Sequence, residues 1–200
     1  MLPRSPWLVV NVRIAMTIPI IATVMRGLWL IAEWIHSLNH KAESAERDKF
    51  SRTIWDVGTC VGVVGVIVGY TDVGHVETGS SFLALGGVVV MSVGLAVRWA
   101  AIYTLGRYFT RTVTIKNDHR IIRRGLYKYL RHPAYTGALI AQAGLGLAFT
   151  NWLSAVLIFA PILVAALYRM RVEEEALVEA FGGEYVEYAK HTKRLIPKVY

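Results

Sequence analysis

Long apolar segments separated by short charged ones set the pattern of this chain. Three apolar segments are clear, namely Trp55–Tyr70, Phe82–Leu105 and Tyr135–Tyr168. The third is about twice the length of one membrane span and is interrupted at Thr150–Trp152, so it predicts two helices that form a hairpin across a bilayer. Together these segments predict four transmembrane helices.

The first apolar segment, Trp7–Ile35, is less regular because charged residues interrupt it. Arg26 and Glu33 are seven residues apart, so they share a helix face and can pair inside a bundle. We interpret the segment as a further span that is retained and not cleaved as a signal peptide, with an interfacial helix as the alternative. The predicted fold class is therefore all-α, a multi-span integral membrane helical bundle of about five transmembrane helices.

The basic residues are concentrated in loops between the apolar segments. The formal net charge is +8, which can indicate nucleic-acid binding, but eight Lys and Arg against one acid lie in Arg107–Arg131 alone. Lys41–Arg52 carries four more, whereas Thr71–Ser81 carries none. This alternation predicts that the basic loops and the C-terminus face the cytoplasm, in a cell inner membrane or an endoplasmic-reticulum-like membrane. We expect membrane lipids as partners and no nucleic acid.

Two further patterns concern packing and metals. Gly58, Gly62, Gly65 and Gly69 follow steps of four, three and four residues, which places them on one helix face and predicts close helix packing. Cys60 is the single cysteine, so a thiolate metal cluster is excluded and no metal is expected.

A polar motif stands where the basic loop meets the predicted hairpin. Pro133 lacks an N–H group and fits the first turn of a helix, so a span should begin there, with His132 at or near its cap. The helix N-terminus, His132 and the nearby basic residues predict an anion site, in which Tyr135 shares a face with His132. These basic residues are Arg131, Arg124 and Lys128. The alternative is that the basic residues meet lipid head groups and Tyr135 lies in the interfacial belt.

A second polar pair closes the far end of the hairpin. Arg169 and Glu173 are four residues apart, where the last apolar helix leaves the bilayer. The two helices of a hairpin return to the same membrane face, so His132 and Tyr135 can meet this pair in space. The alternative is a surface salt bridge between Arg169 and Glu173, worth about 0–1 kcal/mol.

The order of these motifs resembles the isoprenylcysteine carboxyl methyltransferase family, within a wider group that includes phospholipid N-methyltransferases. The resemblance covers His119–Pro197: a basic loop "HRIIRRGLYKYLRHPAYTG", an apolar hairpin, and "RMRVEEEALVEAFGGEYVEYAKHTKRLIP". In the last motif, Gly182–Gly183 should divide the polar tail into two short helices. The resemblance implies an enzyme that uses S-adenosyl-L-methionine and releases S-adenosyl-L-homocysteine, with a pocket built by the cytoplasmic loop and the C-terminal helices.

The family's functional positions carry over residue by residue. The resemblance assigns Arg169 to substrate binding, and Arg169 and Glu173 to catalysis. Thr112 or Thr114 stands where some relatives have Gln, which leaves that contact open. The cofactor-binding positions implied by the resemblance are His119, Arg120, Ile121, Ile122, Tyr127, His132, Pro133, Ala134, Tyr135 and Glu173.

The chemistry of these residue types leaves the methyl acceptor open. A carboxylate is already ionised at pH 7 and needs only orientation, which Arg169 can give, whereas an amine needs a base such as Glu173 or Glu174. We expect carboxyl O-methylation of a lipophilic acceptor such as an isoprenylcysteine, with a phospholipid amine or a small thiol as alternatives.

Two alternative hypotheses come from other classes of function. One is a structural or transport membrane protein, and the other is a nicotinamide-dependent reductase with the same hairpin. Arg98 and Arg169 lie near helix ends, where they can snorkel, which disfavours a transport path. We expect two regions: residues 1–105 as three N-terminal spans and residues 106–200 as the catalytic part.

Overall fold

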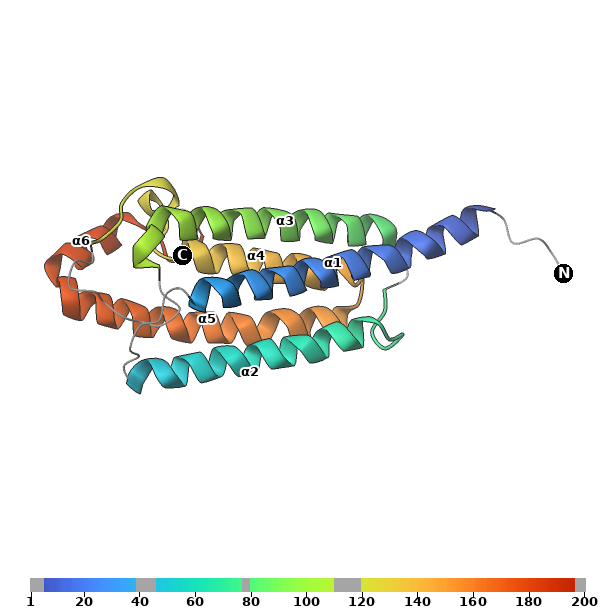
Figure 1. The fold of residues 1–200 in the computed structure, drawn as a ribbon, viewed down its shortest axis with the longest axis horizontal. Coiled ribbons are helices and arrows are strands. Elements are labelled where there is room, and N and C mark those ends of the chain that lie inside the picture. The colour runs from blue at the N-terminus through green and yellow to red at the C-terminus, as the bar shows by residue number, and fades with distance from the viewer. Residues whose placement is uncertain (1–5, 39–45, 77–79, 110–119, 197–200) are drawn as a thin grey trace.

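The computed structural model describes residues 6–38, 46–76, 80–109 and 120–196. The helices α1 to α5 lie along one axis as a bundle, and α6 covers one end of it (Figure 1). The described start of α1 lies at the opposite end. The elements in chain order are α1 (Pro6–Leu38), α2 (Glu46–Gly69), α3 (Ser80–Leu105), η1 (Gly106–Tyr108), η2 (Gly125–Lys128), α4 (Pro133–Ala148), α5 (Trp152–Phe181) and α6 (Gly183–His191).

The all-α membrane architecture predicted from the hydrophobic pattern is confirmed, with one difference in α4. Four of the described helices, α1, α2, α3 and α5, are long and apolar enough to cross a membrane. α4 has 16 residues, about 24 Å at 1.5 Å per residue, and most of its residues are buried. A hydrocarbon core is about 30 Å thick, so α4 is a short helix enclosed by its neighbours, although it belongs to the predicted hairpin.

The helices begin and end close to the predicted positions, except in the polar tail. α4 begins at Pro133, and Asn151 caps α5 by accepting a hydrogen bond from the Ser154 N–H at 3.0 Å. Gly182 has a φ of 52°, which suits glycine and separates α5 from α6. However, α5 runs without interruption from the membrane segment to Phe181, so the first of the two tail helices is the end of α5.

Two glycine seams hold the bundle together. The predicted one joins α2 to α5: a Cβ on Gly65 would lie 2.9 Å from Leu157 Cβ, so only glycine allows this approach. A tighter seam between α3 and α4 was not predicted, because its glycines are divided between two helices. There a Cβ on Gly87, Gly94, Gly137 or Gly144 would lie 2.2–2.4 Å from a backbone nitrogen of the facing helix.

The charged residues of α1 do not pair with each other as predicted. Arg26 donates a hydrogen bond to Gln142 Oε1 on α4 at 2.5 Å. Glu33 forms an ion pair with Arg98 of α3 and accepts a hydrogen bond from Trp29 Nε1 at 2.5 Å. Packing against α3 and α4 supplies these partners, which the sequence of α1 alone does not show. The bundle position and apolarity of α1 favour a span over an interfacial helix.

Arg98 and Arg169 do not snorkel, contrary to the expectation from their positions near helix ends. They are 6% and 7% exposed, so both side chains are inside the bundle. Arg98 also donates a hydrogen bond to the Ala134 carbonyl at 3.0 Å. This contact ties α3 to the first turn of α4.

Candidate functional site

A pocket lies at the end of the bundle where α4 begins and α5 emerges. Its walls come from α1, α2, α3, the η2 region, α4, α5 and α6. The cavity volume is about 150 Å³, whereas one water needs about 10–15 Å³ on the same measure, so a ligand of many atoms fits. The pocket is the meeting point of the basic loop, the hairpin and the polar tail.

The structure brings nearly all of the sequence-predicted residues to this pocket. Pro133 does not line it; the residue is fully buried and fixes the start of α4. His119, Thr112 and Thr114 lie outside the described residues. The predicted residues that line the pocket are Arg120, Ile121, Ile122, Tyr127, His132, Ala134, Tyr135, Arg169 and Glu173.

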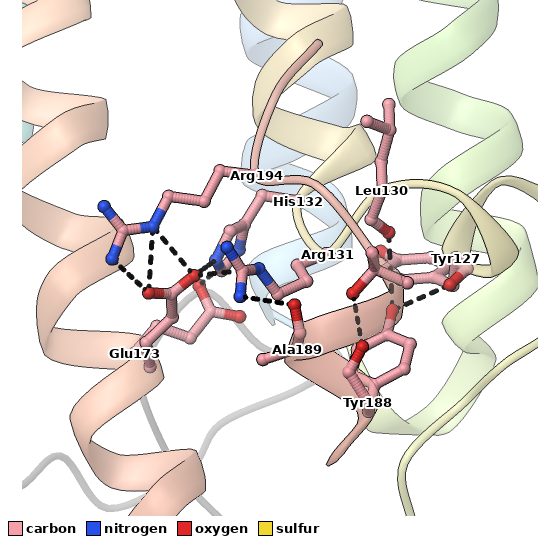
Figure 2. Close-up of polar contacts among 10 residues, drawn as sticks. Tyr127, Leu130, Arg131, His132, Glu173, Tyr188, Ala189 and Arg194 are labelled. Carbon is pink, nitrogen blue, oxygen red and sulfur yellow. Dashed lines mark hydrogen bonds and ion pairs between the residues drawn. The ribbon is translucent and has the colours of Figure 1, made fainter. Parts of the chain in front are cut away.

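Tyr188 ties the η2 segment to α6, the helix whose residues Tyr185 and Tyr188 form the roof of the pocket. Its hydroxyl donates a hydrogen bond to the Tyr127 carbonyl at 2.7 Å and lies 3.4 Å from the Leu130 carbonyl (Figure 2). Burial raises the pKa of Tyr188 to about 12, and burial also raises the pKa of Tyr127 well above its usual value. Both phenols are therefore neutral at pH 7.

Next to the pocket, three basic side chains hold Glu174, and we call the four residues the Glu174 cluster (Arg131, His132, Glu174 and Arg194). Arg194 Nη2 donates to Glu174 Oε2 at 2.6 Å, and His132 Nε2 lies 3.1 Å from Glu174 Oε1. Arg131 Nε lies 3.3 Å from Glu174 Oε1. Figure 2 shows Arg131, His132 and Arg194 converging on this region. These partners occupy Glu174, so of the two predicted candidate bases only Glu173 faces the pocket.

In the Glu174 cluster, two basic residues of the predicted anion site are already paired with a carboxylate of the protein. Arg131 and His132 contact a protein carboxylate, and Arg123 pairs with Glu184 of α6 at 3.2 Å. The backbone of the final segment also pairs with the loop before α4, because Arg131 N–H donates to the Lys193 carbonyl at 2.7 Å. The basic loop is therefore anchored on the polar tail, which the charge pattern did not show.

Glu173 has a different environment from its neighbour. Its side chain is 34% exposed, against 12% for Glu174. Among the residues that the structure describes, its ion-pair contact is His132 Nδ1 at 3.9 Å, too long for a hydrogen bond. The structure records no ion pair between Arg169 and Glu173, both of which it describes. Glu173 is thus available to a ligand in the pocket.

Arg169 is fixed by the neighbouring helices and lines the same pocket. Its Nη1 donates a hydrogen bond to Ser51 Oγ of α2 at 3.2 Å, and its side chain hydrogen-bonds the side chain of Tyr135. Trp55 of α2 packs edge-on against Tyr135, with ring centroids 5.9 Å apart. The sequence did not predict this α2 wall, because nothing in it sets Ser51 or Trp55 apart from other residues near a membrane surface.

The fold and the site define a multi-pass helical membrane protein with a pocket of charged, aromatic and apolar side chains at one end of its bundle. Residues 87–179 match the isoprenylcysteine carboxyl methyltransferase (ICMT) family. This match over residues 87–179 confirms the resemblance predicted from the sequence. The matched part contains α4, nearly all of α5 and most of α3, and therefore most of the residues that line the pocket.

Individual relatives give the same picture. The chain is 33% identical over 115 residues to "Protein-S-isoprenylcysteine O-methyltransferase B" of Arabidopsis thaliana, covering 56% of this chain and 58% of the relative. It is 31% identical over 121 residues to "Protein-S-isoprenylcysteine O-methyltransferase" of Homo sapiens, covering 58% of this chain and 42% of that protein. The chain thus spans about half the length of the curated relatives it matches.

A solved structure shares the fold. It is titled "Structure of the eukaryotic intramembrane Ras methyltransferase ICMT (isoprenylcysteine carboxyl methyltransferase) without a monobody". The TM-score is 0.56 at 24% sequence identity, and the match covers 72% of this chain and 52% of that chain. The likeness concerns the helical architecture.

Proposed function

We propose that this protein is an integral membrane methyltransferase that transfers a methyl group from S-adenosyl-L-methionine to the carboxylate of a lipophilic acceptor such as an isoprenylcysteine. The observation that carries the proposal is one pocket. It is lined by Glu173, which is available to a ligand, by Arg169, which is buried and oriented, and by the loop residues that the family resemblance assigns to the cofactor. The names of the relatives point to the same reaction.

The residues present fit this methyl donor, which is a cation at sulfur and a zwitterion at its amino-acid end. Glu173 offers a carboxylate without a short protein partner among the described residues, suited to an amino group or ribose hydroxyls. Ile121, Ile122 and Leu177 supply apolar surface for a nucleoside. When bound, the donor supplies a methyl group on a sulfonium, and transfer of that group leaves a neutral thioether.

The protein's part in the reaction is orientation. Ser51 and Tyr135 hold the Arg169 guanidinium, which can receive an acceptor carboxylate through two parallel hydrogen bonds. A carboxylate oxygen held in line with the methyl carbon and its bond to sulfur needs no general base, so positioning supplies much of the acceleration. The bundle and α6 line the pocket, and limited access of water to a bound acceptor would favour transfer over side reactions.

We further propose that the pocket and the C-terminus face the cytoplasm, in a cell inner membrane or an endoplasmic-reticulum-like membrane. The basic loops support this orientation, because Lys and Arg accumulate on cytoplasmic flanks. The described start of α1 and the position of α6 at opposite ends of the bundle agree with an odd number of crossings (Figure 1). Residues 106–200 would then be the catalytic part, which residues 1–105 support within the membrane.

The test is methyl transfer by the purified protein with isotopically labelled S-adenosyl-L-methionine and a farnesylated cysteine as acceptor. A methyl ester releases methanol in mild base, whereas a methylated amine or thioether does not. Base-labile label in the lipid product is expected. Base-stable label on a phospholipid amine or a small thiol would instead support the alternative acceptors, and no transfer to any of the three would contradict the proposal.

A further inference from the structure

Tyr185 of α6 presents a buried hydroxyl group that has no protein partner among the described residues. The residue is 4% exposed, and its hydroxyl oxygen makes no hydrogen bond within the part of the chain that the structure describes. It also lines the pocket. Tyr188, one turn later on the same helix, is similarly buried, but its hydroxyl donates to the Tyr127 carbonyl at 2.7 Å.

This difference between two neighbouring tyrosines is informative. A buried polar group left without a hydrogen bond costs about 1–3 kcal/mol, so such groups are rare in native proteins. A tyrosine whose hydroxyl served only packing would be better replaced by phenylalanine. The hydroxyl of Tyr185 is therefore placed for a molecule that enters the pocket.

The hydroxyl of Tyr185 is a donor at physiological pH. Burial, followed by the nearby carboxylates of Glu174 and Glu173, raises the pKa of Tyr185 well above its ordinary value. The proton stays on the oxygen, and neither carboxylate accepts it in the structure. The complementary group on a ligand is a hydrogen-bond acceptor.

The side chains around Tyr185 indicate which part of a methyl donor its hydroxyl would contact. Tyr185 lies beside the Tyr188 ring, with centroids 5.9 Å apart, and Leu177 and Phe181 line the same pocket. Neutral aromatic and apolar side chains suit the planar base and ribose of a nucleoside. The nearby Glu173 carboxylate can accept from ribose hydroxyls, and the carboxylate of the amino-acid end is better matched by Arg120.

We propose that Tyr185 is a further binding residue, whose hydroxyl donates a hydrogen bond to the nucleoside part of the methyl donor. This inference rests on the proposed function, since it concerns the same pocket and the same cofactor. It adds the α6 roof to the binding residues, which until this point come from the loop, α4 and α5. It also gives α6 a direct role in ligand binding besides covering the bundle.

The experiment is calorimetry on the full-length protein in detergent, with S-adenosyl-L-homocysteine and with 5′-methylthioadenosine, which keeps the nucleoside and lacks the amino-acid end. Tyr185→Phe should weaken both ligands by the same factor, about 3- to 10-fold, the value of one neutral hydrogen bond. The melting temperature of the ligand-free protein should be unchanged or higher, because the lost hydroxyl has no protein partner. The matched control is Tyr129→Phe, since Tyr129 is 60% exposed and outside the pocket.

The outcomes separate this inference from the proposed function. If the wild-type protein binds S-adenosyl-L-homocysteine and Tyr185→Phe binds both ligands equally well, the inference is wrong and the proposed function stands. Weaker binding of S-adenosyl-L-homocysteine with unchanged binding of 5′-methylthioadenosine would also overturn it, by placing the contact at the amino-acid end. A lower melting temperature of the ligand-free variant would show a structural role instead. No binding by the wild-type protein would overturn both proposals.

Discussion

Two neighbouring acids at the end of α5 belong to two different regions of the molecule. Glu174 lies in the Glu174 cluster, where Arg194 and His132 are 2.6 and 3.1 Å from its oxygens. Glu173 lies in the pocket, where its described ion-pair contact is 3.9 Å long. The two residues have the same chemistry and adjacent positions, but one turns toward the protein and the other toward a cavity. Glu174, whose charge is paired, stabilises the wall of the pocket. Glu173, whose described ion-pair contact is long, remains available to a ligand.

The largest effect should come from breaking the Glu174 cluster, whose central carboxylate is 12% exposed. Glu174→Gln removes the charge that three basic side chains share, and should lower the free energy of unfolding by about 3 kcal/mol, as for a broken buried ion pair. Thermal or chemical unfolding of the ligand-free protein in detergent measures this. Glu175→Gln is the matched control, since Glu175 is exposed. Equal stability of the two variants would mean that the cluster does not hold the pocket wall.

Arg169 should affect turnover more than cofactor affinity. Arg169→Ala removes the group proposed to orient the acceptor carboxylate, so single-turnover methyl transfer should fall by a factor of about 10². The dissociation constant of S-adenosyl-L-homocysteine should stay nearly unchanged. Arg169→Lys should restore little activity, because Lys lacks the planar two-point geometry. The neighbouring exposed Arg171 gives the control variant Arg171→Ala.

A contrary result for Arg169 is equally clear. A loss of cofactor affinity as large as that caused by replacing Glu173 would remove the division of roles between these two residues. A small loss of turnover would favour an amine or thiol acceptor, because a guanidinium offers neither of them a charge-paired contact.

Glu173→Gln should act on the ligand and not on the fold. Loss of one charge-assisted hydrogen bond predicts about a tenfold increase in the dissociation constant of S-adenosyl-L-homocysteine. The melting temperature of the ligand-free protein should stay close to the wild-type value, because no short protein contact is lost among the described residues. A clear drop in that temperature would place Glu173 with Glu174 as a structural acid and remove the contrast between them.

The smallest effect concerns the roof of the pocket and depends on pH. Burial raises the pKa of Tyr188 to about 12 from an ordinary value near 10, so folding favours the neutral phenol. The stability that this provides is fully present below pH 10 and is lost as the pH rises toward 12. The melting temperature of the wild-type protein should therefore fall more steeply over this interval than that of Tyr188→Phe. Parallel slopes would contradict the buried environment of this hydroxyl.

Local sequence signals predicted the parts of the fold that depend on neighbouring residues. The starts and ends of helices at Pro133, Asn151 and Gly182 follow from the conformations of these residues, and the α2 glycine stripe follows from helical spacing. The predictions that were wrong concern contacts with residues of other helices. Arg26 faces Gln142 and Glu33 faces Arg98, pairs separated by more than 60 residues, so no spacing rule on α1 could find them.

The candidate site likewise contains residues that the sequence predicted and residues that it missed. The residues expected to bind the cofactor came from the family resemblance, and those that the structure describes lie together, with Pro133 just behind the wall. Ser51 and Trp55 were missed because α2 lies outside His119–Pro197, the part of the chain that carries the resemblance. Glu174 and Arg194 were missed as structural partners because "VEEEAL" shows only a run of acids, and the packing of the final segment decides which one is buried.

The most direct test of the central claim is titration of S-adenosyl-L-homocysteine into the purified wild-type protein, followed by the same titration into Glu173→Gln and Glu175→Gln. We predict binding of one ligand per chain, weaker binding to Glu173→Gln, and unchanged binding to Glu175→Gln. Absence of both binding heat and a thermal shift at millimolar ligand would contradict the claim that this pocket holds a methyl donor.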